Sequence, residues 1–191
     1  MGVFVTPCNA ILLHLFFKQR TQIFVCSTHA LKKGNITEVV NLEKEITEKP
    51  KVAFSAGLTN SGYIEALGNT DLNLVFTKII TNVGQAYSKT TGFFTAPVKG
   101  VYYFRFTVMD ILSSRYMNIR MLKNGEQVMW LSEFDTDGHE TYLSSGVTLQ
   151  LEVGDVVNMR LPASYKLFDN SDNRSTFSGF LAQACGYRGQ A

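Results

Sequence analysis

The chain has 191 residues, of which 45% are hydrophobic and 18% are charged, and its formal net charge at pH 7 is +2. This length suits one well-packed domain plus an additional segment, and the composition excludes a disordered chain. Residues 51–191 carry 12 basic and 12 acidic side chains, so they lack the basic surface that nucleic-acid binding requires. Nucleic acid is therefore excluded as an expected partner.

Residues 1–30 form an N-terminal segment that we interpret as a secretion signal of unusual composition. The apolar run from Ala10 to Phe17 is too short to span a membrane, and no Lys or Arg precedes it, although secretion signals usually begin with positive charge. A second hypothesis starts the signal at Lys18 and Arg20 and places cleavage near residues 28–30. An alternative first exon explains the same residues. We expect a secreted protein without a membrane span, chiefly because of the domain that follows.

Residues 31–50 are polar and carry charges of both signs. Near-heptad spacing relates Ile36, Val39 (or Val40), Glu43 and Ile46, which fits a short helix that brings three chains together. A flexible stalk is the alternative. Little more than one heptad is too short for a stable helix, and this favours the stalk. Asn35 begins an Asn-Ile-Thr triplet and Asn173 an Asn-Arg-Ser triplet, so both are candidates for N-glycosylation.

Three cysteines are present, at positions 8, 26 and 185, and none forms a CxxC pair. Their spacing predicts neither a zinc site nor a dense disulfide framework. If the N-terminal segment is removed, Cys185 in the tail 185–191 is left alone. It is then either an idle thiol or the partner in an intermolecular disulfide.

From residue 51 onward, short runs of alternating apolar and polar residues indicate strands. The clearest is 101–109, where Tyr102, Phe104, Phe106 and Val108 share one face. The pair Asn124-Gly125 predicts a tight hairpin turn, because both residues adopt positive φ readily. Further predicted strands are 52–56, 74–76, 92–96, 117–121, 147–151, 157–161 and 177–184. Some ten strands without a crossover helix predict an all-β sandwich or barrel.

The segment from residue 76 to residue 106 resembles the signature of the complement C1q globular domain. The residues that carry this resemblance are Phe76, Asn82, Tyr87, Phe94, Gly100, Tyr102, Phe104 and Phe106. Further family hallmarks are Gly154-Asp155 and the final run Phe177-Ser178-Gly179-Phe180-Leu181, so the resemblance covers about residues 51–184. We interpret the signature as core and turn residues, which identify a fold and not an active site.

The resemblance implies a ten-stranded jelly roll, related to the tumour necrosis factor fold, that assembles as a homotrimer or as a heterotrimer with related chains. Members of the family are extracellular and non-enzymatic. This sequence contains no Gly-X-Y repeat, so it forms no collagen triple helix. It is most similar to the short collagen-free C1q-like proteins of fish.

No arrangement of residues predicts catalysis. The three histidines are His14, His29 and His139, and no nucleophile elbow, phosphate-binding loop or paired-Cys metal motif can be assembled. We therefore expect a binding protein and no enzyme, with no cofactor other than calcium.

Two segments are candidate ligand-binding loops. In residues 135–140, Asp135 and Asp137 present the hard oxygen ligands that calcium prefers, and His139 and Glu140 follow them. The full calcium-loop pattern is missing, so a solvated acidic loop is the alternative interpretation.

The second candidate loop, 164–175, surrounds Tyr165 and Phe168 with Asn, Asp and Ser. Exposed aromatic rings beside amides suit carbohydrate or protein ligands, while turn chemistry explains the same composition without a ligand.

The leading functional hypothesis is a secreted trimer that recognises microbial or altered-self surfaces in innate immunity. Three weak sites at fixed spacing bind such a surface more strongly than one. The alternative is an extracellular signalling ligand of the cerebellin or tumour necrosis factor type, which binds a cell receptor.

Overall fold

A computed structural model describes residues 40–41, 50–111, 115–134 and 138–184, and it divides the chain into two compact units, Met1–Lys49 and Pro50–Ala191. In the first unit only Val40 and Asn41 are described. None of the helical segments in the described residues has the length and apolar character needed to cross a membrane. All that follows concerns the second unit.

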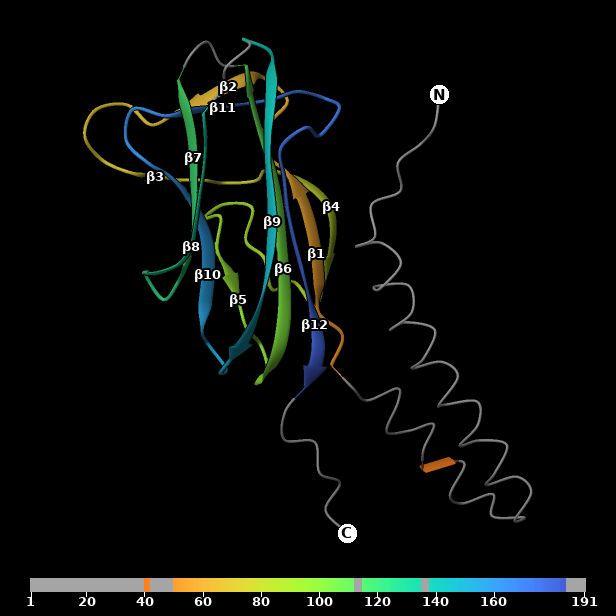
Figure 1. The fold of residues 1–191 in the computed structure, drawn as a ribbon. Helices are drawn as coiled ribbons and strands as arrows, with labels where there is room; N and C mark the ends of the chain where they lie inside the picture. The colour runs from red at the N-terminus through yellow and green to blue at the C-terminus, as the bar shows by residue number, and fades with distance from the viewer. Residues whose placement is uncertain (1–39, 42–49, 112–114, 135–137, 185–191) are drawn as a thin grey trace, which may run out of the picture. The chain divides into compact units, whose positions relative to one another are not determined.

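The second unit is a sandwich of two antiparallel sheets (Figure 1). Its strands are β1 Ala53–Gly57, β2 Gly62–Glu65, β3 Leu72–Asn73, β4 Lys78–Val83, β5 Phe94–Thr95, β6 Gly100–Ile111, β7 Tyr116–Lys123, β8 Glu126–Phe134, β9 Glu140–Leu151, β10 Val156–Leu161, β11 Lys166–Asp169 and β12 Thr176–Ala184. The predicted all-β jelly roll is confirmed.

One sheet has seven strands and the other has five. The first follows the order β2-β11-β6-β12-β1-β4, with β9 also paired to β6, and the second follows β3-β10-β7-β8, with β5 also paired to β10. The first and last strands of the domain, β1 and β12, lie side by side. One strand prediction is wrong: residues 74–76 are an extended segment between β3 and β4, although Leu74 and Phe76 are buried. A run of apolar residues indicates that a segment is buried, but a buried segment need not pair in a sheet.

Alternation along β6 builds one wall of the core. Tyr102, Phe104, Phe106 and Val108 are all at most 1% exposed, as the sequence predicts. They share the hydrophobic core with side chains of β7 and β10, which are Met117, Ile119, Met121, Val157, Met159 and Leu161.

The ring of Phe54 on β1 lies at the centre of the aromatic packing between the sheets. It stacks on Tyr87 with ring centres 4.7 Å apart and meets Phe177 edge-on at 4.9 Å. Burial raises the pKa of Tyr87 to about 12, and its hydroxyl accepts a hydrogen bond from the backbone N–H of Phe76 at 2.9 Å. The side chain of Asn82 bonds to the backbone of Tyr87. The signature residues therefore hold one another in place.

Gly179 on β12 allows this packing. A Cβ atom at Gly179 would lie 2.6 Å from Phe104 and 2.8 Å from Phe54, which is closer than real Cβ contacts come. The absent side chain lets rings from two neighbouring strands close over β12.

The substitution Gly179→Ala should therefore destabilise the domain by about 1–3 kcal/mol, because the added methyl group overpacks the aromatic core. Chemical denaturation measures the change. Ala182→Ser, at an exposed position of the same strand, should leave stability within about 0.5 kcal/mol of the wild type. Equal stability of Gly179→Ala and wild type would show that the core yields easily at this point.

Two turns at one end of the sandwich are joined by side chains. Asn124 and Gly125 both have positive φ, so the predicted Asn-Gly hairpin is present between β7 and β8. The amide of Asn124 donates to the Asp155 carboxylate at 2.9 Å and accepts from the backbone N–H of Val156. Lys123 contributes an ion pair to Asp155 at 2.9 Å. Hydrogen bonds from Asn124 and Lys123 hold the pKa of Asp155 at about 2, well below its ordinary value of 3.8.

Replacing Asp155 by Asn should make the domain less stable at neutral pH, and the difference should depend on pH. The pKa of Asp155 is depressed in the folded state, so its contribution is present above about pH 4 and is lost as the pH falls towards 2. Urea denaturation midpoints of both proteins, measured from pH 7 to pH 2, should converge at the acid end. A gap that persists at pH 2 would exclude the ionised carboxylate as its cause.

Candidate functional site

The predicted acidic loop is only partly visible. Asp135 and Asp137 lie outside the described residues, while His139 is exposed and Glu140 begins β9. The Glu140 carboxylate forms an ion pair with Arg174 and accepts a hydrogen bond from the Tyr142 hydroxyl at 3.3 Å. Within the part of the chain that the structure describes, no three Asp, Glu, His or Cys side chains are grouped to hold a metal ion. Calcium binding stays a prediction.

The second predicted loop contains a strand. β11 runs through residues 166–169 and pairs with β2 on one side and β6 on the other. Tyr165 is half-buried against the core, and Phe168 is half-buried with its ring 5.1 Å from Tyr63. The two rings are therefore only partly exposed, because residues 166–169 pair with strands on both sides. A role of Tyr165 and Phe168 in ligand binding stays a prediction.

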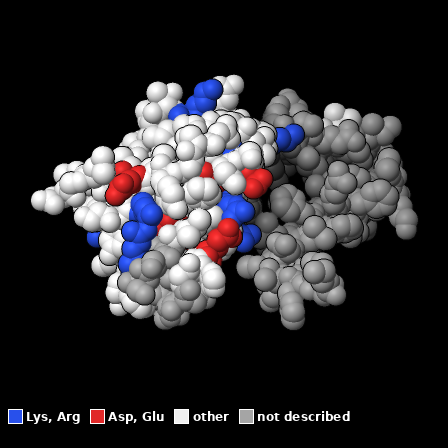
Figure 2. All heavy atoms as spheres, turned by 90° about the horizontal axis from the view of Figure 1, so that it is seen from above, with Lys and Arg blue, Asp and Glu red and all other residues white. Residues whose placement is uncertain are grey.

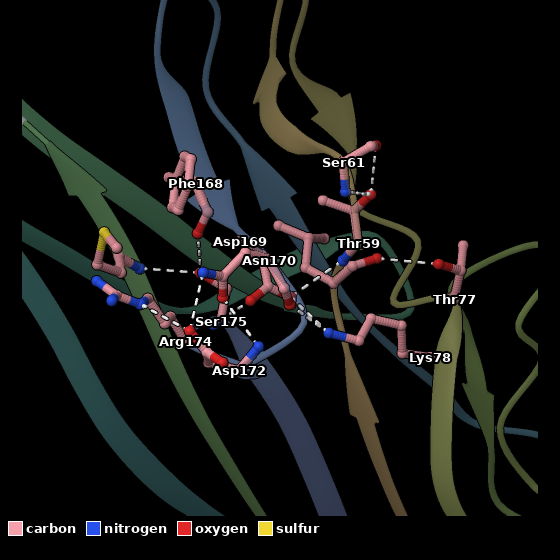
Figure 3. Close-up of polar contacts among 12 residues, drawn as sticks. Thr59, Ser61, Thr77, Lys78, Phe168, Asp169, Asn170, Asp172, Arg174 and Ser175 are labelled. Carbon is pink, nitrogen blue, oxygen red and sulfur yellow. Dashed lines mark hydrogen bonds and ion pairs between the residues drawn. The ribbon is translucent and has the colours of Figure 1, made fainter.

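A buried carboxylate at the end of β11 organises the neighbouring segments (Figure 3). Asp169 is fully buried, and its two oxygens accept hydrogen bonds from the backbone N–H groups of Thr59 at 3.1 Å and Ser175 at 3.2 Å. The ammonium of Lys78 lies 3.9 Å from the same carboxylate and also donates to the backbone carbonyl of Asn170. Asp169 thus joins three segments that are far apart in the sequence.

Ser175 extends this polar cluster. Its buried hydroxyl donates to the backbone carbonyl of Phe168 at 2.8 Å and accepts from the backbone N–H of Met109 at 3.0 Å. The sequon residue Asn173 has a φ of 57° and a buried side-chain oxygen beside Gly57. Glycosylation of Asn173 stays a prediction, and Asn35 lies outside the described residues.

The structure reveals a cleft that the sequence did not indicate. Its volume is about 500 Å³, and its lining comes from the ends of β6, β7 and β8 and from the segment before β11. The rings of Tyr116 and Phe134 stand on one side, with centres 4.8 Å apart, and both are exposed. The lining residues are Asp110, Arg115, Tyr116, Phe134, Ala163, Ser164, Tyr165 and Lys166. Tyr165 is the one sequence-predicted ligand residue among them.

A buried acid lies in the wall of this cleft. Asp110 is 1% exposed, and burial raises the pKa of its carboxyl although the backbone N–H of Ile111 donates to it. Arg115, about half exposed, pairs with it at 3.3 Å. Aromatic walls beside a few charged groups are typical of ligand sites in proteins. In the sequence, these residues stand at strand ends separated by up to 56 positions, which hides the constellation.

Charge at this end of the domain is mixed. Figure 2 looks down on it and shows acidic and basic side chains interspersed among neutral atoms. Such a surface contacts a ligand locally and does not attract polyanions over a distance.

Two neighbouring rows on the outer face of the seven-stranded sheet contain a single charged residue. The ring of Tyr103 crosses towards β9, where its hydroxyl lies 2.4 Å from the position of an added Cβ at Gly146, and it packs beside Phe180 at 5.6 Å. One row of directly paired residues across the sheet is Thr148, Tyr103, Phe180, Ala53 and Val83. The next row is Gly146, Arg105, Ser178, Ser55 and Thr81. We call these two rows the neutral face, and Arg105 is the one charged residue in them.

Removing the buried carboxylate of Asp169 should destabilise this end of the domain. Asp169→Ala leaves two backbone N–H groups without their acceptor and removes the carboxylate beside the partly buried ammonium of Lys78, which should cost about 3 kcal/mol or more. Thermal and urea denaturation measure the loss. Asp172→Ala removes a mostly exposed carboxylate from the same segment and should change stability by about 0.5 kcal/mol or less. Equal effects of the two substitutions would contradict the role of Asp169.

Comparison with known proteins agrees with this architecture. Residues 53–182 match the family described as the C1q domain. Human complement C1q and tumor necrosis factor-related protein 9A is 32% identical over 135 residues, covering 69% of this chain and 39% of that protein. Mouse complement C1q tumor necrosis factor-related protein 3 is 30% identical over 131 residues, covering 69% and 51%. The chain thus spans about half or less of the length of these relatives.

Solved structures show the same fold. The globular domain of zebrafish complement 1qA superposes with a TM-score of 0.51 at 23% identity, covering 69% of this chain and 96% of that one. The tumour necrosis factor Eiger of S. frugiperda gives 0.59 at 12% identity, covering 75% and 99%. The match of the family across residues 53–182, together with the buried signature residues, shows that this chain belongs to the C1q domain family.

Proposed function

We propose that the chain acts as a secreted homotrimer that binds microbial or altered-self surfaces in innate immunity, without enzymatic activity. The family consists of ligand proteins of the C1q and tumour necrosis factor type, which supports a binding role over catalysis. The trimer would present three copies of each ligand site, and such multivalency strengthens weak contacts with a repetitive surface.

The neutral face is the observation that carries this proposal. Protein interfaces are depleted of charge at their centre and enriched in aromatic residues. On the neutral face, Tyr103 and Phe180 pack together, and most of their neighbours are small neutral side chains. A face of this kind suits burial against other copies of the chain. The cleft beside Tyr116 and Phe134 lies elsewhere, at the ends of β6, β7 and β8, and would serve the ligand.

A second candidate function is an extracellular signalling ligand that binds a cell receptor. The names of the curated relatives support it, because both join complement C1q with tumor necrosis factor. The two functions share the trimer and differ in what the cleft contacts.

Light scattering of the purified full chain tests the trimer. The wild type should have three times the mass of one chain, and Ser178→Glu should reduce it to a single chain, because three carboxylates would have to be buried together on the neutral face. Leu67→Glu adds the same charge at an exposed loop position and should leave the mass unchanged. Circular dichroism verifies that each variant keeps its strands. A monomeric wild type would refute the proposal.

Binding to whole bacteria and to a panel of receptor-bearing cells, with and without a calcium chelator, would separate the two functions. Retention on bacteria that is lost in Ser178→Glu supports recognition through avidity. Binding confined to animal cells would favour the signalling ligand.

A further inference from the structure

The outer face of the five-stranded sheet places two arginines side by side. Residues paired directly across neighbouring strands point to the same face, and one row of pairs crosses four strands. It consists of Trp130 on β8, Arg120 on β7, Arg160 on β10 and Asn73 on β3. Like charges directly opposite each other in a sheet are destabilising. The pair therefore lowers stability, as groups at functional sites often do.

Only one of the two guanidinium groups has an acidic partner. Arg120 donates to the Asp71 carboxylate at 2.9 Å, and its guanidinium lies 5.1 Å from the centre of the Trp130 ring. For Arg160, no hydrogen bond or ion pair to the guanidinium is found among the described residues. Two arginines and one aspartate leave the row with one uncompensated positive charge.

Both arginines also have an unsatisfied nitrogen. The Nε atoms of Arg120 and Arg160 are buried and have no hydrogen-bond acceptor. Buried donors in folded proteins are nearly always paired, and an exception is explained by strain, a functional role, or an ordered water or ion. The outer nitrogens of the two guanidinium groups are the ones a ligand can reach, and an oxyanion there would supply the missing negative charge.

The surroundings suit a sugar ring. Trp130 is 56% exposed, and its indole N–H donates to the Asn118 side chain at 2.8 Å, which fixes the ring beside the arginines. The amide of Asn158 is buried beneath this row and donates to Asn73 at 2.6 Å, which supports the strand pairing from below. An exposed indole offers an apolar surface to the C–H groups of a sugar.

We propose that this row, Trp130 with Arg120 and Arg160, binds a sugar that carries a single carboxylate or sulfate group. The oxyanion is held by the two guanidinium groups, and the sugar ring packs against Trp130. One uncompensated charge matches one anionic group. This inference adds a second ligand site, separate from the cleft, to the proposed recognition protein and rests on that function, although the site lies within one chain and does not require the trimer.

Fluorescence of Trp130 can be used to measure binding at this site. Trp130 is the one tryptophan in the sequence, so tryptophan emission of the full-length protein reports on the row alone. Titration with 3′-sialyllactose and with a monosulfated lactose should change the emission saturably, whereas neutral lactose should bind at least about tenfold more weakly, the difference expected from one lost charge-assisted contact. Acetyl-glutamate amide presents the same carboxylate without a sugar and should also bind weakly.

Substitutions at Arg160 test the assignment. Arg160→Gln should weaken binding of the acidic sugars by about tenfold or more and leave lactose unaffected. Its unfolding temperature should equal or exceed that of the wild type, because the contact with Arg120 is relieved. Arg160→Lys keeps the charge but lacks the planar fork, so its affinity should be intermediate. Lys89→Gln removes one positive charge at an exposed position and serves as the control.

The proposed site would be refuted if neither acidic sugar changed the emission, or if Arg160→Gln bound the acidic sugars as tightly as the wild type. It would also be refuted if Lys89→Gln lost as much affinity as Arg160→Gln. Preferential binding of acetyl-glutamate amide would refute a sugar ligand and indicate a protein ligand. Failure of the proposed recognition function would give a different result. A monomeric protein that does not bind bacteria, but whose Trp130 emission still responds to the acidic sugars, would keep the site and refute the recognition role.

Discussion

The aromatic packing around Phe54 is the constraint on which the domain depends. Its ring touches side chains from several strands and loops, including Tyr87 and Phe177, so it fixes the spacing of the two sheets. This packing exists only because Gly179 carries no side chain between Phe54 and Phe104. The absence of a single methyl group therefore lets rings from two strands that flank β12 in the same sheet meet over it.

A core fixed in this way leaves the outer faces of the sheets free to differ. The seven-stranded sheet presents the neutral face, while the five-stranded sheet presents Arg120 and Arg160 in one row. At the end of the sandwich, the buried carboxylate of Asp169 holds the chain segments in place beside the cleft. The two outer faces and the end of the sandwich thus differ in charge and in aromatic content. Assembly and ligand binding can therefore use separate surfaces of the domain.

Much of the fold could be predicted from the sequence, because local patterns encode it: alternation along β6 and the Asn-Gly turn need no distant partner. Strand β11 was missed because its Asn- and Asp-rich neighbourhood is typical of turns, and its pairing is decided by strands far away. The burial of Asp169 depends on Thr59, 110 positions earlier. The cleft and the arginine row were missed for the same reason. Register brings Arg120 opposite Arg160, and register is not visible in a single sequence.

The pairing of β1 with β12 has a consequence for biosynthesis. Phe54 and Gly179 are direct neighbours in the sheet although 125 positions separate them in the chain. Contacts of such long sequence separation form late and slow the folding of β proteins. β1 can pair with β4 early, but its other edge stays unpaired until the final strand has left the ribosome, so the growing chain exposes apolar surface beside Phe54 for most of its synthesis. Expression of this domain should depend on chaperones that shield that surface until the last strand arrives.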